Sequence, residues 1–280
     1  MVHAVVARNV CKVYGNSDAY REKQRFDASS SDSKPSVAAV DHATFEVYEG
    51  ELFGIVGRGV SGKSTLLRLI ATQLLPDKGE MQVYGYDVVE QPVEVRSLLR
   101  LVHFKTSCFR KLSPVENILF GDHMYAMSGV DTRGRVEEIL LCMGLTKPAM
   151  YRPMGNMAPG IRQMIAIARA LLSQPRLLLV DEPTRRLDPL SMREVRQAIK
   201  TLNQETGLTI LLATRDATEA EDLCDRVMIM DSRKILFTDT HAGVRRPHTP
   251  IANEADTDGD ASDLAGKNLL QQGVTYQKTG

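Results

Sequence analysis

The segment from Gly57 to Ser64 constrains the fold of this chain more than any other part of the sequence. It reads GRGVSGKS and matches the pattern GxxxxGK[ST]. A short apolar run, Leu52 to Val56, precedes it. Apolar residues expected on one face of a helix follow it: Leu66, Leu67, Leu69, Ile70, Leu74 and Leu75. A glycine-rich loop between a buried strand and a helix lets backbone N–H groups surround phosphate oxygens. The sequence therefore predicts an α/β domain that binds a nucleotide.

Each part of this loop has an expected role in binding ATP and Mg²⁺. The glycines allow close approach of the backbone, and the start of the helix adds partial positive charge. Lys63 is expected to reach the β- and γ-phosphates, and the Ser64 hydroxyl is expected to ligate Mg²⁺. The predicted nucleotide-binding residues of the loop are Gly57, Arg58, Gly59, Val60, Ser61, Gly62, Lys63, Ser64 and Thr65. A glycine turn without a ligand is the alternative, which the flanking strand and helix disfavour.

Two carboxylates, Asp181 and Glu182, follow a second apolar run at Leu177 to Val180. Sheets of the α/β class place their ligands at the carboxyl ends of strands. Asp181 is therefore predicted to hold Mg²⁺, and Glu182 to face the γ-phosphate and orient or deprotonate the attacking water. Adjacent acids at a strand end are often merely solvated, but their combination with the phosphate loop favours hydrolysis.

The remaining pattern predicts a sheet, a helical middle section and two polar segments. Apolar residues indicate a first strand ending near Tyr14, and the polar stretch 15–37 is expected to be an exposed insertion. Mostly helical spacing runs from Glu90 to Leu172, and short apolar runs at 177–180, 208–213 and 227–230 then indicate a mainly parallel sheet covered on both faces. Residues 241–280 are acidic and are expected to form a flexible tail.

Composition excludes several classes of protein. Lys plus Arg and Asp plus Glu each number 35 in the 280 residues, so the zero net charge does not indicate a nucleic-acid partner. The apolar runs are far shorter than the roughly 18 residues of a membrane span, and the first residues lack the pattern of a secretory signal. The four cysteines form no CxxC pair, which favours reduced thiols in a cytosolic protein.

From Val5 to Phe237 the order and spacing of these motifs resemble the nucleotide-binding subunits of ABC transporters. The resemblance is carried by LSPVENILF, by IRQMIAIARALLSQPRLLLVDEPT, by RRLDP and by LLATRDATEAEDLCDRVMIM. It implies a nucleotide-binding domain over residues 1–240, with a P-loop NTPase (RecA-like) core, an N-terminal antiparallel β part and a helical subdomain near 90–165. It further implies an ATPase that uses ATP and Mg²⁺, pairs with a second ABC subunit and with a transmembrane permease, and lies at the cytoplasmic face of the cell membrane.

The resemblance also assigns roles that the residues alone do not. Tyr14 falls where the family's adenine-stacking aromatic residue would lie, and Arg215 replaces the histidine that senses the γ-phosphate. The family's LSGGQ-type signature, which binds the γ-phosphate held by the opposing subunit, reads Met157-Ala158-Pro159-Gly160-Ile161 here. Ala158 has no hydroxyl and Pro159 has no N–H, so two donors are lost, whereas proline still suits the first turn of a helix.

Two functions from different classes remain open. One is a transport ATPase, with the segments at 109–118 and 123–127 resembling exporters more than importers. The other is an ATP-binding but weakly hydrolysing subunit of a heterodimer, or a regulatory protein. Glu182 favours the first, and the altered signature and Arg215 favour the second. A P-loop small-molecule kinase would need neither the signature helix nor RRLDP.

Overall fold

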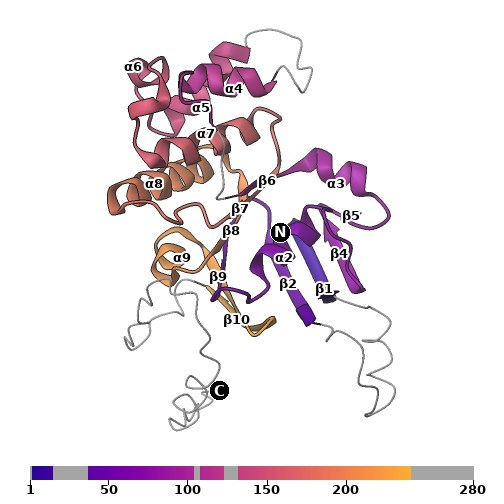
Figure 1. The fold of residues 1–280 in the computed structure, drawn as a ribbon. Coiled ribbons are helices and arrows are strands. Elements are labelled where there is room, and N and C mark those ends of the chain that lie inside the picture. The colour runs from indigo at the N-terminus through magenta and orange to yellow at the C-terminus, as the bar shows by residue number, and fades with distance from the viewer. Residues whose placement is uncertain (1, 15–36, 104–107, 123–131, 241–280) are drawn as a thin grey trace, which may run out of the picture. The chain divides into compact units, whose positions relative to one another are not determined.

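The computed structural model describes residues 2–14, 37–103, 108–122 and 132–240 of the 280-residue chain (Figure 1). The predicted insertion lies outside these residues except for Val37, and so does the predicted acidic tail. None of the helices in the described part combines the length and the apolar character that crossing a bilayer requires. All four cysteines are free thiols.

The N-terminal part contains an antiparallel sheet with the strand order β2-β1-β4-β5. Its strands are β1 (His3–Tyr14), β2 (Val37–Tyr48), β4 (Lys78–Val83) and β5 (Tyr86–Asp87). In β2 the residues Ala43, Phe45 and Val47 are buried and alternate with exposed ones, as the period of two predicts. The expected antiparallel β part is therefore present, with one face of the sheet in the core.

A second sheet of six strands has the order β10-β9-β3-β8-β7-β6. Its strands are β3 (Leu52–Val56), β6 (Leu99–His103), β7 (Leu177–Asp181), β8 (Thr209–Thr214), β9 (Arg226–Asp231) and β10 (Lys234–Thr240). All neighbours are parallel except β9 and β10. Because β8 lies between β3 and β7, the carboxyl ends of these three strands meet at one edge, where ligands are expected.

Alternate residues of the central strands pack into two separate hydrophobic clusters, one on each face of the sheet. Phe53 and Ile55 of β3 pack with the antiparallel sheet and α2 (Lys63–Ile70), whereas Leu52 and Val56 point toward the other helices. These helices are α4 (Pro114–Asp122), α5 (Thr132–Cys142), α6 (Lys147–Met150), α7 (Pro159–Leu171), α8 (Pro189–Thr206) and α9 (Ala217–Leu223). The sheet is thus covered on both faces, as expected for an α/β domain with a mainly parallel sheet.

Two details differ from the sequence expectation. The section that we expected to be mainly helical does contain α3 (Pro92–Leu98) and α4 to α7, but Leu99–His103 within it forms β6, the edge strand of the parallel sheet. The helix after the phosphate loop ends at Ile70, because Thr72 takes a left-handed conformation with φ 56°. Leu74 and Leu75, which we expected on the same helical face, therefore lie beyond it, and Leu75 is exposed.

Candidate functional site

The phosphate loop joins β3 to α2, and two of its glycines are required by close backbone contacts. A Cβ on Gly57 would lie 2.2 Å from the Met230 carbonyl oxygen, and one on Gly62 would lie 2.3 Å from that of Ala39. Gly62 is also the N-cap of α2 with φ 102°, a conformation that favours glycine. No acidic residue lies in the first turn of α2, so its N-terminal positive charge remains available to an anion.

Lys63 is buried at the centre of this loop. Its Nζ donates to the carbonyl oxygens of Gly57 at 2.5 Å and Arg58 at 2.9 Å. Burial lowers the pKa of Lys63 to about 8, with the neighbouring carboxylate of Glu182 opposing that shift. An ammonium group desolvated in this way gains much from a phosphate, because the phosphate supplies the counter-charge that water otherwise provides.

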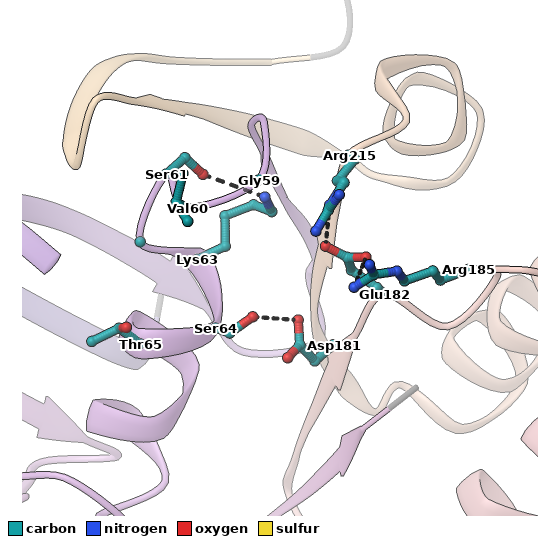
Figure 2. Close-up of a pocket in the computed structure, with 11 residues that line it drawn as sticks. Gly59, Val60, Ser61, Lys63, Ser64, Thr65, Asp181, Glu182, Arg185 and Arg215 are labelled. Carbon is teal, nitrogen blue, oxygen red and sulfur yellow. Dashed lines mark hydrogen bonds and ion pairs between the residues drawn. The ribbon is translucent and has the colours of Figure 1, made fainter. Parts of the chain in front are cut away.

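The two predicted Mg²⁺ ligands lie next to each other. Ser64 at the start of α2 donates its hydroxyl to Asp181 Oδ1 at the end of β7, over 3.0 Å (Figure 2). Ligands on adjacent corners of an octahedron with bonds of about 2.1 Å also lie about 3.0 Å apart. His103 Nδ1 lies 3.8 Å from the other Asp181 oxygen. The oxygen donors and their spacing therefore fit Mg²⁺.

Glu182 has its carboxylate between two arginines (Figure 2). Arg215 Nε donates to Oε1 at 2.8 Å, and Arg185 Nη1 lies 3.4 Å from Oε2. The backbone of Glu182 has φ 48°, a strained conformation for a residue with a side chain and one that is common at active sites. The predicted base and the residue at the switch position are thus brought together across β7 and β8.

These groups line one cavity of about 140 Å³. Its lining consists of Gly59, Val60, Ser61, Gly62, Lys63, Ser64, Thr65, Asp181, Glu182, Arg185 and Arg215. Nearly every predicted loop residue, both acids and Arg215 therefore share it. Arg185 is the member that sequence reasoning missed, although its place three residues after Glu182 was a usable signal.

A buried carboxylate supports the strand end that carries Arg215. Glu219 of α9 is fully buried, accepts a hydrogen bond from the Thr214 hydroxyl and lies 3.4 Å from Arg196 Nε. Burial raises the pKa of Glu219, while the Thr214 bond and the charge of Arg196 oppose that shift. Arg196 also pairs with Asp216 at 2.5 Å, which fixes the start of α9 to α8. Glu219 was not expected from the sequence, and its effect on the site is through Thr214.

Some expected residues lie outside the cavity lining. Tyr14 ends β1 with 42% of its surface exposed, and its stacking role stays a prediction. Gly57 and Arg58 accept hydrogen bonds from Lys63 through their carbonyl oxygens. Ala158 is the N-cap of α7 without a side-chain cap bond, and Pro159 occupies the first turn, as expected.

Comparison with known proteins gives a consistent result. Residues 40–185 match the model of the family described as ABC transporter. The ABC transporter ATP-binding protein NatA of Bacillus subtilis (strain 168) is 33% identical over 207 residues, which cover 74% of this chain and 83% of NatA. The spermidine/putrescine import ATP-binding protein PotA of Mesorhizobium japonicum is 33% identical over 234 residues, covering 84% of this chain and 59% of PotA.

A solved structure agrees with the sequence relatives. The dimeric ATP-binding cassette MJ0796, in a post-hydrolysis state bound to ADP and Pi, is 25% identical with a TM-score of 0.64, and the match covers 85% of this chain and 98% of that one. The fold of this chain therefore also occurs in an ATP-binding cassette whose structure holds ADP and Pi, the products of ATP hydrolysis.

Proposed function

The chain belongs to the ABC transporter family, whose ATP-binding cassettes are ATPases, and we propose that it binds MgATP in the cavity between α2 and the ends of β7 and β8. The observation that carries this proposal is the joint position of Lys63, Ser64, Asp181 and Glu182 around that cavity. Lys63 and the loop N–H groups would hold the phosphates, and Ser64 and Asp181 would hold Mg²⁺. The metal ion would neutralise charge that develops on the phosphates.

Glu182 is the proposed base for the attacking water, and Arg215 the residue that contacts the γ-phosphate. Tyr14 is proposed to stack on the adenine, because its ring is exposed at the end of a strand of the N-terminal sheet. Arg58 in the loop and Thr65 in the first turn of α2 complete the proposed nucleotide site.

The proposed partners are a second ABC subunit and a separate transmembrane permease, with this chain at the cytoplasmic face of the membrane. The absence of a spanning helix among the described residues is compatible with that division of labour. Export is the proposed direction, supported by the sequence resemblance at 109–118; residues 123–127 of the same resemblance lie outside the described residues. The relative PotA is named as an import protein, so the direction of transport is to be tested by a transport assay with the permease.

A second candidate function is an ATP-binding subunit that hydrolyses ATP weakly, in a heterodimer or as a regulator. The observation that favours it is the contact of both Glu182 oxygens with arginines, which occupies acceptor sites of the proposed base that would otherwise be open to water. The start of α7 favours it as well, because Ala158 offers no hydroxyl and Pro159 offers no backbone N–H.

The binding test is a calorimetric titration of MgATP into the full chain and two variants. Lys63→Ala removes a charge-assisted contact and is expected to weaken binding by about tenfold or more. Arg186→Ala is the matched control, because this exposed arginine is absent from the cavity lining. Equal affinities of the parent and Lys63→Ala would reject the site. Phosphate release then separates the two candidates: turnover of about 1 s⁻¹ or faster indicates a transport ATPase, and turnover a hundredfold slower indicates the weakly hydrolysing subunit.

A further inference from the structure

Arg185 has no role in the function proposed above, yet it lines the same cavity as Lys63 and the phosphate loop (Figure 2). It lies in the turn between β7 and α8, and its side chain is 30% exposed. Its guanidinium contacts Glu182 Oε2, while Arg215 contacts the opposite oxygen, Oε1. The two arginines therefore approach the carboxylate from different sides.

The charges around the cavity favour an additional anion. Lys63, Arg185 and Arg215 contribute three basic groups, and Asp181 and Glu182 contribute two acids. If Asp181 is engaged by Mg²⁺, Glu182 is the remaining acid of the cavity lining beside two guanidinium groups. A terminal phosphate carries more charge than one carboxylate and offers three oxygens, and guanidinium groups bind phosphate through paired hydrogen bonds. A phosphate therefore competes effectively with Glu182 for both arginines.

Arg215 already lies against the loop that would hold the phosphates. A Cβ on Gly59 would lie 3.4 Å from Arg215 Cζ, within contact distance of the guanidinium plane. Arg215 thus lies against the phosphate loop, and Arg185 lies in the turn before α8. Both guanidinium groups contact the Glu182 carboxylate between them.

We propose that Arg185 is a γ-phosphate-binding residue that acts together with Arg215 from within a single chain. In this proposal, which rests on the MgATP site proposed above, both arginines exchange the Glu182 carboxylate for the γ-phosphate. The exchange frees Glu182 to contact water. It also supplies, from the chain that binds the rest of ATP, donors that Ala158 and Pro159 do not offer to an opposing subunit.

The experiment compares the affinities for MgADP and for Mg²⁺ with AMP-PNP, a hydrolysis-resistant analogue that retains the third phosphate. Arg185→Gln is expected to weaken analogue binding by about tenfold and to leave ADP binding unchanged, because only the third phosphate contacts this residue. Arg186→Gln, its exposed neighbour, is expected to change neither affinity. Arg185→Lys keeps the charge but loses the paired hydrogen bonds, so an intermediate loss is expected. ADP affinity serves as the check that each variant is folded.

A second pair of variants separates phosphate binding from mere positioning of Glu182. Glu182→Gln removes the competing carboxylate charge, so the parent's preference for the analogue over ADP should rise by about threefold or more. Arg185→Gln should retain its effect in that background. If its effect disappears there, Arg185 acts only through Glu182 and the proposal is overturned.

The remaining outcomes are also decisive. The analogue preference should persist at protein concentrations where sedimentation shows a monomer, and its restriction to the dimer would overturn the single-chain assignment. If the parent binds neither nucleotide, the proposed function fails. If it binds both and Arg185→Gln behaves like Arg186→Gln, only the role of Arg185 fails.

Discussion

The N-termini of α2 and α7 are both helix starts whose backbone N–H groups could bind an anion, but they differ in the donors that their residues offer. The helix α2 begins within the phosphate loop, and α7 begins within Met157 to Ile161, the segment that resembles the family's signature. At α2 the N-cap is Gly62, and Lys63 and Ser64 occupy the first turn. At α7 the N-cap is Ala158, its side chain makes no cap bond, and Pro159 fills the first turn. The start of α2 thus offers the Lys63 ammonium and the Ser64 hydroxyl, whereas the start of α7 offers no hydroxyl at Ala158 and no N–H at Pro159.

The comparison teaches that the fold and the binding chemistry of a helix start have separate requirements. Proline at the first turn costs a helix little, since that N–H has no partner within the helix. Gly160 still allows the close approach of α7 to α8, because a Cβ there would lie 3.0 Å from the Ser191 Cβ. Packing is therefore preserved at α7 while its capacity to bind an anion is reduced.

The largest expected effect is on the rate of ATP hydrolysis at Glu182, beside the start of α2. Glu182→Gln retains the size of the side chain but removes the base, so ATP hydrolysis should fall by about a hundredfold or more while ATP binding persists. Single-turnover measurement of phosphate release checks the rate. Turnover that is measurable in the parent and survives this change would exclude Glu182 as the base.

The next effect tests how strictly the start of α2 depends on its glycine. Gly62→Ala places a Cβ 2.3 Å from a backbone oxygen at φ 102°, and we expect a loss of about 3 kcal/mol in the free energy of unfolding. Gly144→Ala is the matched control, because its φ is 87° with no atom within 4 Å of the added Cβ, and about 1 kcal/mol is expected. Urea unfolding gives both values, and equal losses would contradict the close contact.

The third effect restores donors at α7. The double change Ala158→Ser with Pro159→Gly returns a hydroxyl and an N–H, and in a Glu182→Gln background it should tighten ATP-dependent dimerisation by about tenfold or more. Sedimentation with ATP measures the dimer, and ADP is the control because it lacks the γ-phosphate. Unchanged dimerisation would mean that α7 does not face the nucleotide of an opposing subunit.

The smallest effect concerns the helix alone. Ala158→Ser provides the N-cap of α7 with a side-chain acceptor, and we expect the free energy of unfolding to rise by about 1 kcal/mol. The parent, whose alanine offers no side-chain acceptor, is the comparison. A serine variant no more stable than the parent in chemical denaturation would show that the cap bond does not form.

The sequence predicted those parts of the molecule whose place in the fold follows from a short contiguous stretch of residues. The phosphate loop and the strand at Leu177 to Asp181 are short and contiguous, so spacing alone indicated their place. The strand β6 was missed because it follows α3 without a glycine or proline between them, and its residues also fit the helical spacing of their surroundings. Neither the spacing of apolar residues nor the composition of Leu99–His103 distinguishes a strand from a helix.

The arginine pair at Glu182 shows why part of the site could not be predicted. Arg215 and Glu182 are 33 positions apart, and they meet because β7 and β8 are parallel neighbours with Asp181 opposite Ala213. Strand order depends on the packing of the whole sheet rather than on local residues. Arg185 was close in sequence, but side-chain direction in a turn is set by the tertiary contacts.

Val60 at the tip of the phosphate loop has a consequence for protein engineering. Its side chain is 95% exposed and contributes no burial, yet its backbone has φ 54°, which a β-branched residue adopts at a cost. A library randomised at this position should therefore enrich asparagine and glycine when it is selected for thermal tolerance. The loop thus holds an unused margin of stability at a cavity-lining position whose side chain makes no buried contact.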